Sequence, residues 1–208
     1  MKECTTAAVY RSLQFCKGRT VLPGIRTRIF YIPKRDIVRW PKLPSSTPAG
    51  MDRLAIYQGS FVLAADKTWH VIDLIDNKGK IESESQGIYP ARTFLNKISL
   101  THPGTDSEAT GFAAQANADD FVFLVRQRDG KFRVLGNPFF PTETKPKQDS
   151  GEDVTATDFG TTLAVEVTDI CPAPFYEGLI HADTGYIDAV DGKPYVRSFD
   201  PSFDPTFR

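Results

Sequence analysis

The sequence predicts a mainly β protein of antiparallel strands with a single α-helix. Short extended runs rich in Val, Ile, Phe and Tyr recur along the chain and are separated by turns that contain Pro or Gly. Only one segment combines helix-capping residues with a following run of alanines. The composition, 40% hydrophobic and 12% aromatic in 208 residues, is sufficient to bury the core of one large domain.

The N-terminal part predicts two strands and a loop. Residues 25–32 alternate apolar and polar side chains before a short apolar run that stops at Pro33, which is typical of a strand. Residues 37–40 favour a second, short strand, and the proline-rich stretch 41–50 has the chemistry of a loop. We therefore expect an N-terminal arm at 1–20, a single β domain at 21–181 and a C-terminal tail at 182–208.

Residues 54–85 read as three extended runs, LAIYQGSFVLAA, TWHVIDLID and KIESES. In the second run, residues 68–76, apolar side chains fall on both faces, which predicts a strand covered on both sides. Asn77-Lys78-Gly79 follows directly and places a glycine where a tight turn needs a positive φ. We therefore expect the second and third runs to pair as an antiparallel hairpin.

A strand, a helix and a second hairpin are expected next. The strand covers 93–100, and the helix covers 106–117, where Thr105 or Asp106 can cap the first turn. The runs FVFLVRQ and FRVLGN then flank Arg128-Asp129-Gly130-Lys131. Because an Asp-Gly pair suits a two-residue type I′ turn, these runs predict a hairpin at 121–136.

The C-terminal third predicts a loop, two strands and a tail. Residues 137–160 are rich in Pro, Lys, Asp and Thr with little periodicity, so we expect a long surface loop or a flexible hairpin tip. Strands are expected at 161–170 and 175–181. The tail ends in a near-repeat of Ser-Phe-Asp-Pro, which we expect to pack its phenylalanines on a neighbouring surface or to be disordered.

The charge balance and the cysteines exclude several classes of protein. Lys and Arg number 25 against 26 Asp and Glu, which argues against a dedicated nucleic-acid binder with a broad cationic face. The cysteines Cys4, Cys16 and Cys171 form no CxxC pair, so we expect no disulfide framework, no zinc site and a reducing cytoplasm. No apolar run is long enough for a signal peptide or a membrane span, so we expect no membrane partner.

No motif for catalysis or cofactor binding stands out. Nucleophile-elbow, zincin, phosphate-loop, dinucleotide-binding and EF-hand patterns are all missing, and His70, His102 and His181 are widely scattered. We therefore expect no enzyme activity, no cofactor and no metal. The acidic pairs Glu82/Glu84 and Asp119/Asp120 could serve a glycosidase, but a solvated strand face explains the first pair more simply.

Aromatic residues raise the question of a carbohydrate site. Trp40, Trp69 and Tyr89 could form a platform for stacking sugars. Core packing is the more economical role for Trp69, which lies inside an apolar strand. Trp40, between Arg39 and Pro41, is the better candidate for a contact with another subunit.

The order of several segments resembles the tail tube proteins of tailed phages that infect Bacteroidetes. The segments are GIRTRIFYIPKRDIVRWP, YQGSFVLAADKTWHVIDLIDNKGKIESESQG, TFLNKISLTHPGT, FVFLVRQRDGKFRVLGNP and SGEDVTATDFGTTLAVEV, and the resemblance as a whole covers about 24–181. The resemblance implies a β-sandwich or half-open barrel with one flanking helix and long projecting loops. It also implies hexameric rings that stack into a conduit for DNA, with 137–160 or the 41–53 loop reaching a neighbouring subunit.

The resemblance suggests roles for named residues. Carboxylates that face the lumen of such a tube would repel DNA phosphates, so DNA would pass without specific binding. The candidates for this role are Asp73, Asp76, Glu82 and Glu84. The candidates for contacts between subunits are Trp40, Phe139, Phe140, Lys145 and Lys147. The implied partners are further copies of the chain and other tail proteins, in a virion assembled in the cytoplasm of the host bacterium.

Three other readings remain open. A β-sandwich that binds a carbohydrate or a receptor would be a monomer or trimer with an exposed aromatic cleft. A neck or head–tail completion protein would form one ring without stacking. A hydrolase would need its scattered carboxylates to converge in the fold.

Overall fold

A computed structural model describes residues 12–15, 17–18, 20–43, 51–153, 155–157 and 159–195. Most of the expected N-terminal arm, the centre of the proline-rich loop and the Ser-Phe-Asp-Pro repeat lie outside these residues. The statements about structure below concern the described part of the chain.

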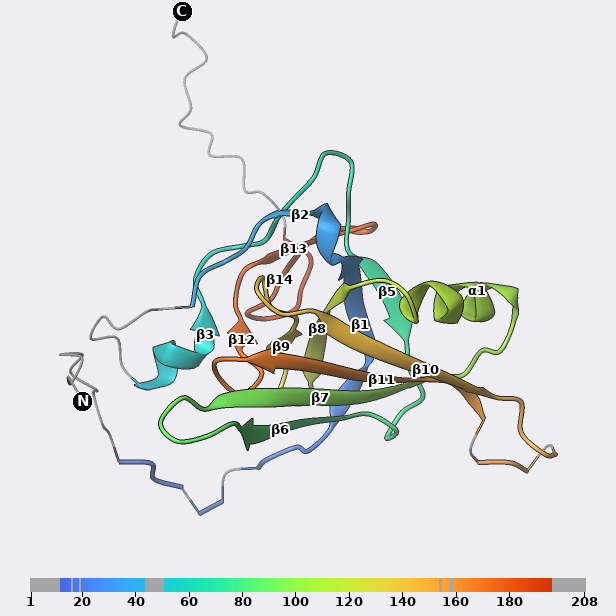
Figure 1. Cartoon of the computed structure of the whole chain (residues 1–208), viewed down its shortest axis with the longest axis horizontal. Coiled ribbons are helices and arrows are strands. Elements are labelled where there is room, and N and C mark those ends of the chain that lie inside the picture. Colours follow the sequence, from blue (N-terminus) through green and yellow to red (C-terminus); the bar gives the residue numbers. More distant parts are fainter. Residues whose placement is uncertain are drawn as a thin grey trace, which may run out of the picture.

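The chain folds into a six-stranded sheet and a four-stranded sheet whose strands run across each other (Figure 1). The larger sheet has the order β3 (Ile56–Tyr57), β12 (Phe175–Tyr176), β9 (Phe132–Leu135), β8 (Phe121–Gln127), β1 (Ile25–Pro33) and β5 (His70–Asp73). The smaller sheet has the order β10 (Thr142–Asp149), β11 (Gly160–Asp169), β7 (Thr93–His102) and β6 (Lys80–Gln86). The prediction of a mainly β, sandwich-like fold is confirmed.

Two short two-stranded sheets and two 3-10 turns complete the fold. β2 (Ile37–Arg39) pairs with β4 (Val62–Leu63), and β13 (Leu179–Ala182) pairs with β14 (Gly185–Asp188). The 3-10 turns are η1 (Lys34–Asp36) and η2 (Met51–Ala55). Among the named strands of the described residues, every pairing is antiparallel except that of β12 with β3.

The six-stranded sheet is buried on both faces. One hydrophobic cluster fills the space between the two sheets and includes Phe123, Val125 and Val165. A second cluster covers the opposite face and includes Leu124 and Trp69 beneath β13 and β14. The continuous apolar run of β8 supplies residues alternately to both clusters, which is what a central strand covered on two sides requires.

The single helix, α1 (Ser107–Ala116), flanks the sandwich. Its N-cap is Asp106, whose Oδ1 accepts a hydrogen bond from the Ala109 N–H at 2.8 Å. Phe112 packs edge-on against Tyr31 of β1, with ring centroids 4.9 Å apart. The predicted helix at 106–117 is therefore confirmed, with Asp106 as the cap.

The expected strands at 25–32, 37–40, 93–100 and 161–170 and the hairpin at 121–136 are also present. The two-sided burial expected of 68–76 is present in part. Trp69 joins the second cluster while Ile72 and Leu74 join the first, but Val71 is exposed.

The hairpin expected at Asn77-Lys78-Gly79 is wrong. β5 pairs with β1 in the larger sheet, whereas β6 pairs with β7 in the smaller one. The chain crosses between sheets after β5, where the Ile75 N–H donates to the Thr101 carbonyl at 2.8 Å. The positive φ belongs to Asn77, at 63°, and not to the glycine. Turn-forming residues therefore mark a change of sheet here.

The type I′ turn expected at Asp129-Gly130 is also wrong. Of the turn residues only Gly130 has a positive φ, at 96°, whereas a type I′ turn needs two. The Gly130 N–H donates to the Gln127 carbonyl at 3.0 Å, and the Gln127 N–H donates to the Lys131 carbonyl at 2.8 Å. This is the three-residue loop in which a type I turn is followed by a glycine bulge.

Further corrections concern segments that lack a strong pattern. The interpretation of 137–160 as a loop is wrong over β10, because Thr142–Asp149 pairs with β11 along its whole length. The strand expected at 175–181 is divided into β12 and β13, which belong to different sheets. The extended run at 54–65 contains the end of η2, then β3 and β4. The β13–β14 hairpin also crosses the domain boundary expected at 182.

Candidate functional site

The acidic residues expected to face a lumen each have a basic neighbour. The nitrogen–oxygen distance is 2.8 Å between Arg28 and Asp73 and 2.5 Å between Arg128 and Asp76. Glu82 lies 2.9 Å from Lys80, and Glu84 lies 3.2 Å from Lys97. The fold brings Glu82 and Glu84 together on β6, but it places Asp73 on the other sheet and Asp76 in the connection between them. They do not form one acidic surface.

Glu82 and Glu84 belong to a larger surface, the outer face of the four-stranded sheet. The inner face carries the buried side chains of Ile98, Leu100, Leu163, Val165 and Val167, so residues one position along each strand point outward. One row across the sheet reads Glu82, Lys97, Glu166, Glu143. We call this outer surface the charged face; its charged members are Lys80, Glu82, Glu84, Lys97, Glu143, Lys145, Lys147, Asp149 and Glu166.

The lysines and glutamates of the charged face balance one another. Lys145 lies 3.2 Å from Glu166 and 3.5 Å from Glu143, and the pairs on β6 continue the pattern. These side chains are largely solvent-exposed, so each pair contributes little to stability. With four lysines against five carboxylates, the face is strongly polar and holds no excess of positive charge for a phosphate chain.

The two edges of the four-stranded sheet differ. β10 carries Pro146 at its centre between Lys145 and Lys147, and both proline and lysine on an edge strand obstruct pairing with another chain. β6, the lowest strand in Figure 1, contains no proline, and no other described strand pairs with its free side. β6 is therefore the less obstructed edge for a strand from another molecule.

The residues expected to contact another subunit lie in three places. Trp40 is half-buried and packs edge-on against Phe61, with ring centroids 5.3 Å apart. Phe139 and Phe140, before β10, are 85% and 37% exposed, so they form an accessible aromatic pair. Lys145 and Lys147 belong to the charged face. The β10–β11 hairpin extends beyond the body of the molecule, as Figure 1 shows.

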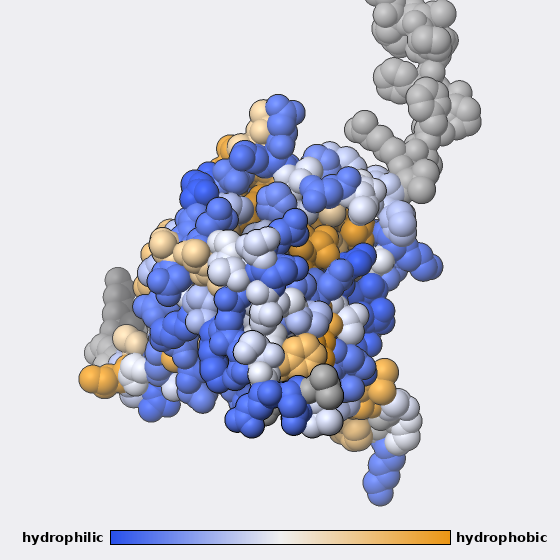
Figure 2. Space-filling view, turned by 90° about the vertical axis from the view of Figure 1, so that its right-hand side faces the viewer, coloured by the Kyte–Doolittle hydropathy of each residue, from blue (hydrophilic) through white to orange (hydrophobic). Residues whose placement is uncertain are grey.

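The expected aromatic platform is not assembled. Trp69 is only 1% exposed and packs against Phe61, in accord with the core role expected for it. Tyr89 lies in the β6–β7 connection and is 78% exposed. The face of the molecule that carries α1 and the hairpin is mostly hydrophilic, with hydrophobic residues in small separate groups (Figure 2).

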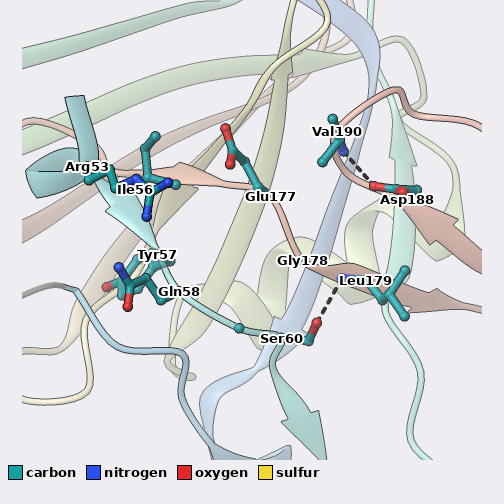
Figure 3. Close-up of a pocket in the computed structure, with 11 residues that line it drawn as sticks. Arg53, Ile56, Tyr57, Gln58, Ser60, Glu177, Gly178, Leu179, Asp188 and Val190 are labelled. Carbon is teal, nitrogen blue, oxygen red and sulfur yellow. Dashed lines mark hydrogen bonds between the residues drawn. The ribbon is translucent and has the colours of Figure 1, made fainter. Parts of the chain in front are cut away.

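A cavity of about 700 Å³ opens beside β3 and β13 (Figure 3). Two of its polar side chains are engaged in holding the backbone. Ser60 Oγ accepts from the Leu179 N–H at 2.9 Å, and Asp188 Oδ1 accepts from the Val190 N–H at 2.8 Å. Arg53, Tyr57, Gln58 and Glu177 supply the remaining polar side chains. The cavity can hold a polar ligand, but no histidine or cysteine lines it.

The histidines have structural contacts. His70 packs on the Tyr31 ring, His102 Nδ1 lies 2.7 Å from the Asp73 carbonyl, and His181 stacks on Tyr186 with centroids 4.4 Å apart. Within the described residues, no cluster of three or more His, Cys, Asp or Glu side chains is placed to hold a metal ion. Burial raises the pKa of Cys171 to about 12, so its thiol stays protonated at neutral pH.

A buried carboxylate that the sequence reasoning missed lies at the end of β11. Asp169 is 1% exposed, and its Oδ1 accepts hydrogen bonds from Asn137 Nδ2 at 2.8 Å and from the Ile170 N–H at 2.6 Å. Burial raises its pKa to about 6, because those two hydrogen bonds only partly offset the loss of solvent. The bond to Asn137 ties the chain that leaves β9 to the four-stranded sheet, so this carboxylate has a structural position.

In the described ranges, no helix has the length and apolar character needed to cross a bilayer. The chain matches no family model, no curated protein and no solved structure. The resemblance to phage tail tube proteins therefore stays a prediction.

Proposed function

We propose that this chain is a non-enzymatic structural protein that assembles with copies of itself into stacked rings, as in the tube of a phage tail. The observation that carries the proposal is the open edge of β6. This seven-residue strand pairs with β7 on one side and with no described strand on the other. Unpaired N–H and C=O groups along such an edge accept a strand from another chain.

The contrast between the two sheet edges supports a directed contact. β10 carries Pro146 and flanking lysines, so its edge is less suited to pairing than that of β6. A strand or hairpin from a neighbour would therefore add at β6 and extend the four-stranded sheet across the boundary between subunits. Repetition around a ring would join these sheets into a continuous wall.

The charged face suits the wall of a DNA conduit. Its lysines are matched by glutamates at 2.9 to 3.5 Å in Lys80–Glu82, Lys97–Glu84 and Lys145–Glu143. A polar surface without an excess of positive charge gives DNA no fixed site at which to release counterions, so the polymer slides past without being retained. Under this proposal Glu82 and Glu84 face the lumen, and Asp73 and Asp76 do not belong to the same surface.

The β10–β11 hairpin and the exposed pair Phe139 and Phe140 are the proposed contacts beyond the ring wall. Exposed aromatic residues gain most by burial against a partner. The partners would be further copies of the chain and other tail proteins, within a virion assembled in the cytoplasm of the host.

Negative-stain electron microscopy of the purified full chain tests the proposal. We expect rings of uniform diameter, and tubes of the same width at higher protein concentration. Rings that never stack would indicate a neck or head–tail completion protein instead. Small particles without symmetry at high concentration would contradict assembly of either kind.

A carbohydrate- or receptor-binding module is the second candidate, and the cavity in Figure 3 favours it. Arg53, Gln58 and Glu177 offer a mixed set of donors and acceptors that suits hydroxyl groups. This alternative predicts a chain that does not form rings and that binds a glycan with an affinity lowered by Gln58→Ala. Ring formation with no glycan binding would favour the structural role.

A further inference from the structure

A second cavity, of about 510 Å³, lies between the six-stranded sheet and the segment around β14. Three arginines line it: Arg26 and Arg28 on β1 and Arg126 on β8. The rings of Phe30, Phe132 and Tyr186 form part of the same lining. We call this cavity the arginine groove.

The positive charge of the arginine groove is only partly compensated. Asp73 neutralises Arg28 through two contacts, at 2.8 and 3.4 Å. Arg126 donates to the carbonyls of Gly130 and Asp191 at 3.0 and 2.8 Å, so its partners are uncharged. Asp191 is nearby, but its carboxylate lies 3.8 Å from Lys193. Within the described chain Arg26 has neither an ion pair nor a hydrogen bond, and Arg126 has no ion pair, so Asp73 and the nearby Asp191 leave the lining with an excess of positive charge.

The side chains of Arg26 and Arg126 approach each other. A methyl group on Gly130 would lie 3.9 Å from Arg126 Nη2 and 4.0 Å from Arg26 Nη2. Burial lowers the pKa of Arg126 and the charge of Arg26 lowers it further, while the charge of Asp191 offsets part of this decrease. The two Nη2 atoms therefore lie no more than about 8 Å apart, and two guanidinium groups on one cavity wall favour an anionic ligand.

The remaining lining offers aromatic surface. Tyr186 is half exposed, and its ring is held by stacking on His181 with an angle of 9° between the planes. Gly192 leaves room for Arg126, because a Cβ there would lie 1.9 Å from Arg126 Nη2. The groove therefore combines fixed cations with a fixed ring, and its ligand should combine carboxylates with apolar rings.

We propose that the arginine groove binds the Ser-Phe-Asp-Pro repeat at residues 198–207 of a neighbouring copy of this chain. The repeat contains Asp200 and Asp204 and no cation, which matches the excess charge of the groove. Its three phenylalanines and two prolines, Phe199, Phe203, Phe207, Pro201 and Pro205, supply apolar surface for Tyr186. Arginine pairs with carboxylates in a bidentate geometry, which gives the contact a defined register.

Such a contact joins different surfaces of two molecules. A heterologous contact of this kind closes into a ring or continues as an open polymer. The inference deepens the proposed function, on which it rests for the presence of neighbouring copies, and it assigns a link that is separate from the β6 edge.

The first experiment measures binding of a synthetic peptide, SFDPSFDPTF, by fluorescence polarisation. The receptor is the full chain with Asp200→Lys and Asp204→Lys, so that its own repeat cannot compete. We expect saturable binding that weakens with added salt and falls about tenfold or more when Arg26→Glu is added. Arg39→Glu, on the exposed side of β2, is the matched control and should leave binding unchanged.

The second experiment asks whether the repeat comes from another copy. The tail variant carrying Asp200→Lys and Asp204→Lys is mixed with the groove variant Arg26→Glu. Both variants also carry a proline on the free side of β6, which prevents assembly through that edge. We then expect a one-to-one heterodimer by sedimentation, because the mixture retains one intact groove and one intact repeat. Peptide binding without heterodimers would place the repeat in the groove of its own chain and would overturn the proposal.

The remaining outcomes separate this inference from the proposed function. No peptide binding, or equal binding to the Arg26→Glu receptor, contradicts the groove contact. Rings that persist in that case leave the proposed assembly standing. Peptide binding with heterodimers but no rings supports the groove contact and contradicts the tube. Binding of a DNA oligonucleotide in place of the peptide, lost with Arg26→Glu, would identify a phosphate site and overturn the assignment of the repeat.

Discussion

At the scale of single residues, the buried polar groups are the most informative feature of the fold. Within the described chain, three buried side-chain oxygens lack a hydrogen-bond partner: Thr142 Oγ1, Thr144 Oγ1 and Asp169 Oδ2. Of these groups only Asp169 can ionise. Its other oxygen links Asn137 to β11, so the carboxyl group is retained where an apolar residue would lose that link.

Replacing Asp169 by Asn tests this account through the pH dependence of stability. The folded pKa of about 6 exceeds the ordinary value of 3.8, so the wild type loses stability as pH rises from 3.8 through about 6. The asparagine side chain of the variant cannot ionise. Relative to the wild type, Asp169→Asn should therefore be more stable at pH 8 than at pH 4. The difference between the two free energies of unfolding, variant minus wild type, should rise by up to about 3 kcal/mol between these pH values.

Urea denaturation at the two pH values measures this difference. Because the asparagine amide leaves an unpaired donor in place of Oδ2, the comparison between pH values is more informative than either value alone. A difference that stays constant from pH 4 to pH 8 would mean that Asp169 does not titrate in the folded state.

At the scale of elements, Gly130 explains the geometry of the β8–β9 hairpin. Its φ of 96° favours glycine, and a Cβ would meet nothing closer than 3.9 Å, so the cost of alanine is in the backbone. Gly130→Ala should lower the free energy of unfolding by about 1 to 2 kcal/mol. Gly111 of α1 is the control, because alanine there meets no neighbour within 4 Å and should stabilise the helix by about 1 kcal/mol. Equal effects of the two changes in thermal unfolding would refute the turn assignment.

The open edge of β6 is tested by proline at two adjacent positions, Ser83 and Glu84. Neighbouring residues of a strand point their N–H groups to opposite sides, so one proline removes an N–H from the β7 side and the other from the free side. We expect the proline that removes an N–H from the β7 side to lower the melting temperature. The proline on the free side should leave the melting temperature near that of the wild type and abolish ring formation. Normal rings from both variants would exclude pairing through β6.

The strands that could be predicted from sequence are those with a strong local pattern. β1, β7, β8 and β11 have long apolar or alternating runs, and Asp106 with the following alanines identifies α1. β10 was missed because TETKPKQD is polar and contains a proline, which an edge strand tolerates. The change of sheet after β5 could not be predicted, because turn residues specify a reversal and do not specify which strand is the partner.

At the scale of the whole molecule, the candidate surfaces depend on contacts between distant parts of the chain. The alternation of Arg26 and Arg28 is visible in the sequence, but Arg126 and Tyr186 join them only in the folded chain. The charged face likewise requires the register of four strands. Of the expected lumen residues, Glu82 and Glu84 share this face, while Asp73 belongs to the arginine groove.

The molecule therefore presents two surfaces suited to copies of itself, the β6 edge and the arginine groove. One offers backbone hydrogen bonds and the other offers unpaired cations, so they differ in their response to salt. Raising the ionic strength should weaken the groove contact and leave the edge contact largely intact. Rings that remain while tubes dissociate, seen by electron microscopy at increasing salt, would assign the groove to the link between rings. Contacts within a ring that come apart at lower salt than the contacts between rings would contradict that assignment.

Self-assembly is the central claim, and sedimentation velocity of the full chain over a wide range of concentration tests it most directly. We predict a chain mass of 23.1 kDa at the lowest concentrations and a defined larger species that grows as concentration rises. A single species of the chain mass at every concentration, with a folded circular dichroism spectrum, would contradict the account.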